Sequence, residues 1–317
     1  MGELQSGLTA LAEQSLQDSL QLVCETLNLA EPAVGVIALG KMGIGAMAPM
    51  SDLDLVFVFD EDRSDLEMAT RFVNRLQTAI ATKMREGVVY ELDTRLRPSG
   101  RSGAPTVSVD SLVTHHLERA RTWEHIAFVF ARAICADESL QNTVNQIKND
   151  LINRPRASRQ FKIDVMSMWQ RIESHRVVSP QAAVFNSKLR VGGLMQTEYF
   201  CAAHILLNGA GSADHATFDQ LMEASLPASS LDTIRAGLAH WRTLQIYERL
   251  LGLEGQAIDQ FPRRYRAQLC EQLNLTSFEE LAERSAFFAD VVTTILMAPF
   301  AEATPPDDWQ ETAVEWC

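Results

Sequence analysis

The sequence has few of the features that mark secreted, zinc-binding or membrane-spanning proteins. Its five cysteines are an odd number and form no Cys-x-x-Cys pair, so we expect reduced thiols rather than a disulfide framework or a zinc site. Its apolar runs are far shorter than the roughly 18 residues of a membrane helix, and no signal peptide is apparent. These features predict a cytoplasmic protein that does not enter a membrane.

Basic residues are also few relative to acidic ones. The chain has 28 lysines and arginines against 41 aspartates and glutamates, a net charge of −13 at pH 7. A nucleic-acid backbone is bound by a basic stripe, and none is visible, so nucleic acid is not an expected partner. Hydrophobic residues, by contrast, make up 46% of the 317 residues, which is enough for two domains with complete cores.

Two aspartates stand at the start of a strongly apolar segment, residues 51–59 (Ser-Asp-Leu-Asp-Leu-Val-Phe-Val-Phe). Side chains alternate along a strand, so Asp52 and Asp54 point to one side and Leu53 to the other. Their oxygens can converge on one or two cations, and an oxygen-only set without His or Cys favours Mg²⁺. The alternative is a pair of aspartates that caps a turn or lies in solvent.

Three glycines precede this strand, at Gly40, Gly43 and Gly45. Without a Cβ atom, the chain can turn sharply there and bring N–H groups close to a polyphosphate. The glycine segment therefore favours a phosphate site over the turn-capping alternative.

A third carboxylate follows in residues 88–101 (Val-Val-Tyr-Glu-Leu-Asp-Thr-Arg-Leu-Arg-Pro-Ser-Gly-Arg). On an extended strand, Asp93, Arg95 and Arg97 would share one face. Taken alone, they could form a structural ladder of ion pairs. Together with the two earlier aspartates, they match the ligand set of a two-metal phosphoryl or nucleotidyl transferase, in which Arg95, Arg97 and Arg101 would neutralise a triphosphate or departing pyrophosphate.

Four motifs in this order carry a family resemblance: residues 40–43 (Gly-Lys-Met-Gly), 51–55, 90–100 and 122–125 (Thr-Trp-Glu-His). The chain resembles glutamine synthetase adenylyltransferase, a bifunctional bacterial enzyme with an AMP-removing and an AMP-adding half. The sequence of residues 91–100 is most similar to that of the C-terminal, AMP-adding half. Residues 188–200 resemble a segment of the helical region of that family.

The resemblance implies a fold, a reaction and a set of site residues. The fold is α+β, a nucleotidyltransferase-type mixed sheet with flanking helices, followed by an all-α bundle. The reaction moves AMP from ATP to a tyrosine hydroxyl of glutamine synthetase with Mg²⁺ or Mn²⁺, and a PII-type signalling protein is a second implied partner. The implied catalytic and metal-binding residues are Asp52, Asp54 and Asp93. The implied nucleotide-binding residues are Gly40, Lys41, Gly43, Ser51, Arg95, Arg97 and Arg101.

Three positions depart from the family pattern. Ile44 replaces the second glycine of the turn motif, Ala46 replaces a glutamate, and Gln196 replaces an aspartate of the helical segment. Two alternatives therefore stand beside AMP addition. One is phosphorolytic removal of AMP from the same protein, and the other is a degenerate, non-catalytic module that senses nucleotide or docks on glutamine synthetase.

The distribution of apolar residues predicts two domains, 1–150 and 151–317, separated in the polar stretch 137–159, where Asn153-Arg154-Pro155 breaks any helix. In the first, we expect an N-terminal helix, strands at 34–39 and 53–59, a helix opened by a capping box at 64–67, and a strand around Asp93. Residues 108–136 are expected to be mainly helix, with Arg132 on its charged side. The second domain is expected to contain helices near 160–176, 194–208, 215–225, 230–252, 262–273 and 277–299.

Overall fold

The computed structural model describes residues 2–81, 90–98, 100, 103–174, 186–213, 215–253 and 262–301. The described residues fall into two compact units. The first contains the residues up to Arg154 together with Gly211–Phe218, and the second contains the remaining residues from Pro155 onward. No sequence pattern indicates that a short segment from the second half returns to the first unit.

The first unit is α+β. Its helices are α1 (Gly2–Leu27), α2 (Gly40–Gly43), α3 (Leu66–Ala81), α4 (Val109–Thr114), the π-helix η2 (His115–Arg119), α5 (Thr122–Val129) and α6 (Glu138–Asn153). Its strands are β1 (Gly35–Ala38), β2 (Leu53–Phe59), β3 (Leu92–Asp93), β4 (Thr106–Ser108) and β5 (Arg132–Ile134).

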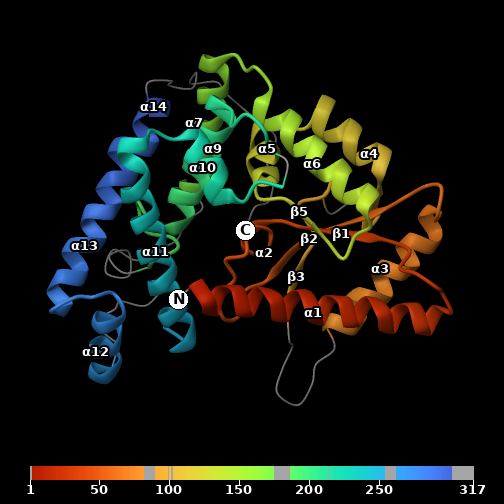
Figure 1. Ribbon diagram of the computed structural model, residues 1–317, viewed down its shortest axis with the longest axis horizontal. Helices are drawn as coiled ribbons and strands as arrows, with labels where there is room; N and C mark the ends of the chain where they lie inside the picture. The colour runs from red at the N-terminus through yellow and green to blue at the C-terminus, as the bar shows by residue number, and fades with distance from the viewer. Residues whose placement is uncertain are drawn as a thin grey trace. The chain divides into compact units, whose positions relative to one another are not determined.

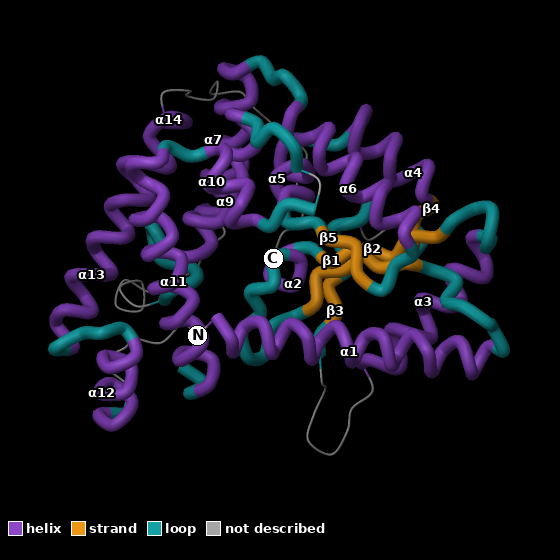
Figure 2. Tube along the Cα trace, in the orientation of Figure 1, coloured by secondary structure: helices purple, strands orange, loops and turns teal. Residues whose placement is uncertain are grey.

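The five strands form one small mixed sheet in the order β3-β2-β1-β5, with β4 also paired to β2 (Figure 2). β1 is antiparallel to both β2 and β5. The two short strands β3 and β4 run parallel to β2, β3 beside its first two residues and β4 beside its last three. β2 is thus the central strand, and its N-terminal end meets β3.

Helices cover both faces of this sheet, as strand alternation requires (Figure 1). Leu55 and Phe57 of β2 point into a core shared with α1 and α3, whereas Val56 and Val58 point into a second core shared with α4, α5 and α6. Because Asp54 is two residues before Val56, its side chain belongs to the second face.

Two predictions in this unit were wrong. The strand around Asp93 is only two residues long, and residues 95–98 form a turn, so Arg95 and Arg97 are not placed by strand alternation. Residues 108–136 are mainly helical, as predicted, but the helix is interrupted by a π-helical turn and ends before β5, so the predicted place of Arg132 on a helix is wrong and it lies on a strand. The polar stretch after it also holds a full helix, α6, whose end at Asn153 agrees with the predicted break.

The described part of the second unit contains helices and no strand. They are α7 (Ser158–Ser174), α9 (Leu194–Asn208), most of α10 (Phe218–Ser225), α11 (Ala228–Leu250), α12 (Arg263–Gln272), α13 (Phe278–Val291), the π-helix η4 (Val292–Met297) and α14 (Ala298–Ala301). Its core is built from large rings, among them Trp169, Phe200, Trp241 and Phe300, each at most 1% exposed. The predicted helices of this half are confirmed to within a few residues.

One helical stretch of the described chain, Phe278–Ala301, is long and apolar enough to cross a membrane by length and composition alone. Several of its side chains, including Phe288, Leu296 and Phe300, are buried within the second unit. A core helix of a soluble protein has the same composition, so the stretch is weak evidence for a membrane segment.

Candidate active site

The pairing of β2 with β3 brings two of the predicted acids together. Leu53 is in register with Leu92, and Asp54 is in register with Asp93. Residues directly opposite each other on paired strands project their side chains to the same face. Asp54 and Asp93, almost 40 positions apart in the sequence, are therefore neighbours on one side of the sheet.

Asp52 completes a three-carboxylate cluster. One carboxylate oxygen from each of Asp52, Asp54 and Asp93 lies within 4.8 Å of those of the other two. Asp52 is exposed and the other two are partly buried, so the cluster opens to solvent. Within the described residues, this is the group of acidic, histidine or cysteine side chains whose geometry could hold a metal ion.

Arg95 folds back onto this cluster. Its backbone N–H donates to Asp93 Oδ1 at 2.9 Å, and its Nε donates to Asp93 Oδ2 at 2.8 Å. The hydrogen bonds with Asp93 raise the pKa of the Arg95 guanidinium, and the charges of Asp93, Asp54 and Asp52 raise it further. Arg95 therefore acts as the positive counter-charge of the whole cluster.

Arg97 has a different environment. Its Nε donates to the carbonyl of Ala104 at 2.9 Å and its Nη1 to the carbonyl of Thr94 at 2.5 Å, so it ties together the turn that follows β3. Burial lowers the pKa of its guanidinium. Arg95 and Arg97 still line the same hollow of about 450 Å³ as Asp52 and Asp93. The third predicted arginine, Arg101, lies outside the described residues.

Glycine is required at both ends of the turn formed by α2. Gly40 has φ +49°, and a Cβ atom there would lie 2.2 Å from Asp54 Oδ2. At Gly43 a Cβ atom would lie 2.0 Å from the carbonyl oxygen of Phe130. The first glycine thus lets the turn approach a carboxylate of the cluster, and the second lets it pack against the backbone that leads into β5.

The other predicted nucleotide-binding residues lie around the turn. Ser51 is 3% exposed, and its Oγ accepts a hydrogen bond from the Ala48 N–H at 3.1 Å. Lys41 is partly buried within α2 and is not among the residues that line the hollow. Contact of these residues with phosphate stays a prediction.

The Thr-Trp-Glu-His motif is engaged in local contacts at the start of α5. Glu124 Oε2 accepts from the Arg121 N–H at 2.8 Å, and Glu124 Oε1 lies 2.6 Å from His115 Nε2. His125 is buried, with Nε2 3.3 Å from the carbonyl oxygen of His116. None of these residues lines the hollow beside the cluster.

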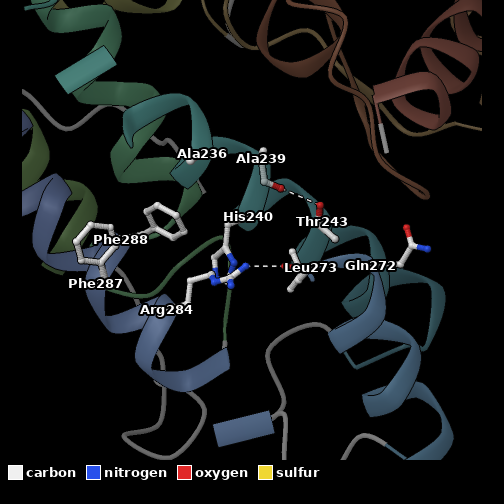
Figure 3. A pocket seen from close by; sticks show the side chains of 9 residues that line it. All are labelled: Ala236, Ala239, His240, Thr243, Gln272, Leu273, Arg284, Phe287 and Phe288. Carbon is white, nitrogen blue, oxygen red and sulfur yellow. Dashed lines mark hydrogen bonds between the residues drawn. The ribbon is translucent and has the colours of Figure 1, made fainter. Parts of the chain in front are cut away.

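The second unit has its own hollow, of about 430 Å³, between α11, α12 and α13 (Figure 3). His240 of α11 is its most buried polar side chain, at 3% exposure. Its Nε2 lies 2.9 Å from Ser285 Oγ, and its Nδ1 has no hydrogen-bond partner among the described residues. Burial, together with the positive charges of Arg284 and Arg190, lowers the pKa of His240 to about 3.

This buried histidine predicts acid sensitivity. Folded His240 stays neutral down to pH about 3, whereas in the unfolded chain it binds a proton below about 6.5. The free energy of unfolding should therefore fall as the pH is lowered from 6.5 towards 3, by up to about 1.4 kcal/mol per pH unit from this group. His240→Gln should remove about 2 kcal/mol of the difference between pH 6.5 and 4.5, measured by urea unfolding.

His215 supplies the control for this measurement because it is exposed. His215→Gln should leave the difference between the two pH values unchanged. A His240→Gln protein as acid-sensitive as the unmodified one would show that His240 is protonated in the folded state.

An α+β unit that presents three carboxylates and an arginine beside a glycine turn has the side chains of a site that handles phosphate groups with divalent cations. Comparison with known proteins finds one family to which part of the chain is similar. Residues 3–147 match the family model for glutamate-ammonia ligase adenylyltransferase.

Curated relatives extend the similarity. Each of the following is named a bifunctional glutamine synthetase adenylyltransferase/adenylyl-removing enzyme. The chain is 33% identical to the Aromatoleum aromaticum protein over 202 residues, which are 62% of this chain and 21% of that protein. It is 34% identical to the Methylococcus capsulatus protein over 56% of this chain and 20% of the relative. The Bordetella pertussis protein is 31% identical over 85% of this chain and 30% of its own length.

These matches confirm the resemblance suggested by the motifs, and they concern an enzyme family that transfers AMP. The chain spans only about a fifth to a third of the length of these relatives.

Proposed function

We propose that this chain transfers AMP from ATP to a tyrosine hydroxyl of glutamine synthetase and releases pyrophosphate. The observation that carries the proposal is the cluster of Asp52, Asp54 and Asp93, whose oxygens lie within 4.8 Å of one another beside a glycine turn. The named activity of the relatives supports the choice of AMP and of glutamine synthetase. On this proposal the sheet and its helices form a nucleotidyltransferase-type domain.

The chemistry of the cluster fits a hard divalent cation. Its donors are carboxylate oxygens without histidine or cysteine, and Mg²⁺ or Mn²⁺ bound by few carboxylates takes its remaining ligands from water and phosphate. Asp52, Asp54 and Asp93 would hold the ions. When bound, such ions neutralise charge on the phosphates as the phosphorus–oxygen bonds exchange.

The protein side chains would prepare the attacking hydroxyl and the leaving group. Asp93 accepts the proton of the tyrosine hydroxyl, whose oxygen forms a bond to the α-phosphorus while the bond to the β-phosphate oxygen breaks. Arg95, which pairs with Asp93 in the structure, would turn to the departing pyrophosphate and so release the Asp93 carboxylate. Arg95 would thus pair first with the Asp93 carboxylate and then with the pyrophosphate.

The remaining predicted residues would hold the nucleotide. Gly40 and Gly43 let the backbone of the turn approach the phosphates, with Lys41 and Ser51 beside them. Arg97 supports the turn that carries Arg95 through its bonds to Thr94 and Ala104, and Arg101 would add a second positive charge for the triphosphate.

We further propose a cytoplasmic location and, as a second partner, a PII-type signalling protein. Both follow from the family resemblance. Glutamine synthetase remains the partner on which the proposed activity depends.

The test is incubation of the chain with labelled ATP, Mg²⁺ and glutamine synthetase from the same source. Label on the synthetase that depends on Mg²⁺ and is absent with EDTA is the expected result. Release of label from a previously modified synthetase, with no addition, would instead support AMP removal. If ATP and the synthetase bind but neither reaction occurs, the chain is a docking module.

A further inference from the structure

Arg132, the first residue of β5, reaches from its strand to the glycine turn of α2. Its Nε donates to the carbonyl of Gly43 at 3.1 Å, and its Nη2 donates to the carbonyl of Met42 at 3.0 Å. Glu13 of α1 forms an ion pair with the same guanidinium. Three segments far apart in the sequence therefore meet at one side chain.

These bonds complete the turn. α2 is a single turn of four residues, and the last carbonyls of any helix lack partners within the helix. The carbonyls of Gly40 and Lys41 accept from the N–H groups of Ile44 and Ala46. The carbonyl of Gly43 accepts from Arg132, and a cation at this end of a helix is also favoured electrostatically.

The opposite end of the turn touches the carboxylate cluster. The Leu39 N–H donates to the carbonyl of Asp54 at 2.9 Å, and the Cα of Gly40 faces the Asp54 carboxylate so closely that no Cβ atom fits between them. If the turn shifted, it would therefore displace the Asp54 carboxylate, because closely packed atoms cannot overlap.

We propose that Arg132 is a positioning residue for the carboxylate cluster. It fixes the turn at residues 40–43. This turn then holds the Asp54 carboxylate in its place in the cluster. The inference rests on the proposed function, since it assumes that the cluster binds a divalent cation with ATP.

The pattern of partners explains why this position needs arginine. Two carbonyls and one carboxylate surround the group, and the planar guanidinium has enough donors in fixed directions to serve all three. The ammonium group of lysine is a point charge without this fork. We therefore expect Arg132→Lys to restore part of what Arg132→Gln loses.

The experiment measures Mn²⁺ binding in the presence of ATP by electron paramagnetic resonance, for the unmodified chain and for Arg132→Gln and Arg132→Lys. Arg63→Gln is the matched control, because Arg63 is another arginine of the same unit that forms ion pairs, with Glu31 and Asp137, and among the described residues these acids belong neither to the turn nor to the cluster. Arg132→Gln should weaken Mn²⁺ binding at least about 10-fold, because one carboxylate ligand is displaced. The Mn²⁺ affinity of Arg132→Lys should lie between those of Arg132→Gln and the unmodified chain. Arg63→Gln should not change it.

A second readout separates this inference from the proposed function. Hydrogen exchange of the backbone amides at residues 39–46, without ligand, should be faster in Arg132→Gln and unchanged in Arg63→Gln. If the unmodified chain binds no Mn²⁺ with ATP, the proposed function fails, and exchange alone then decides whether Arg132 fixes the turn. Equal exchange in Arg132→Gln and the unmodified chain, or equal Mn²⁺ affinity where Mn²⁺ binds, would overturn the positioning role.

Discussion

Asp93→Asn is expected to slow AMP transfer at least about 10²-fold while leaving ATP affinity within a few-fold. Asp93 lies in register with Asp54 and takes part in the carboxylate cluster, so the change removes both a negative ligand and the proposed proton acceptor. An amide of the same shape cannot accept the hydroxyl proton at neutral pH. Single-turnover transfer of labelled AMP measures the first effect, and calorimetry of ATP binding measures the second.

The stability of this variant tests a separate point. Three converging carboxylates repel one another, which alone would make Asp93→Asn at least as stable as the unmodified chain without ligand. The structure adds an opposing effect, since asparagine removes the negative charge and one of the two oxygens to which Arg95 donates. We therefore expect the melting temperature to change little.

Asp137→Asn is the matched control, because it makes the same chemical change outside the cluster. Asp137 caps α6 through a hydrogen bond from the Leu140 N–H at 2.9 Å, and asparagine caps helices equally well. Transfer by this variant should equal that of the unmodified chain. Full transfer activity in Asp93→Asn would remove Asp93 from the chemistry, whatever happens to ATP binding.

The parts of the fold that the sequence predicted best are strongly apolar segments whose ends are marked by glycine or polar residues. The expected helix at 194–208 is α9, with bounds identical to the prediction, because Gly193 and Gly209 mark its ends and nearly every side chain between them is buried. The second strand is β2, whose alternation divides its side chains between two cores. Repeated burial of this kind leaves a clear pattern in the sequence.

The short strands could not be predicted because their own residues carry little signal. β5 has three residues and begins with an arginine, and it forms because β1 has an edge on which it can pair. β3 stops at Asp93, where Arg95 folds back to pair with the carboxylate instead of continuing the strand. The extent of each strand depends on a partner that is distant in the sequence or on a local ion pair. Neither strand shows a hydrophobic period in its own sequence.

The same limit applies to the candidate site. The acids were recognisable as residue types at strand spacing, and the structure brings Asp52, Asp54 and Asp93 together. The ion pair between Arg132 and Glu13 was not recognisable, since these residues are 119 positions apart in the sequence. Only the path of the chain places them beside the turn.

Two of the three departures from the family pattern fit this structure without strain. Ile44 has φ −93° and ψ 4°, the conformation of the third residue of a type I turn, and Gly45 takes the left-handed position with φ +70°. Gln196 Oε1 accepts from the Gly192 N–H at 2.7 Å, a bond that an aspartate could also accept. Ala46 is 5% exposed, so a glutamate there would need space that the alanine does not leave. The packing thus accommodates Ile44 and Gln196, and it is closed around the alanine at position 46.

Gly40→Ala is expected to reduce AMP transfer by about 10²-fold in a protein that still folds. The added Cβ atom would lie 2.2 Å from Asp54 Oδ2, and the atom that gives way is the end of a side chain rather than backbone. The carboxylate must therefore move by an ångström or more, and a misplacement of about 1 Å at a reacting centre costs about that factor. Transfer of labelled AMP and Mn²⁺ affinity in the presence of ATP should fall together.

Gly45→Ala separates this clash from backbone strain. Gly45 has φ +70°, close to the +49° of Gly40, so alanine at either position pays the cost of a left-handed conformation, about 1–2 kcal/mol. In the described part of the chain nothing lies within 4 Å of a Cβ atom at Gly45, so its replacement should lower the melting temperature and leave transfer and Mn²⁺ affinity nearly unchanged. Equal losses of transfer in the two variants would assign the effect to the turn backbone. Unchanged transfer in Gly40→Ala would show that the Asp54 carboxylate is not needed where the structure places it.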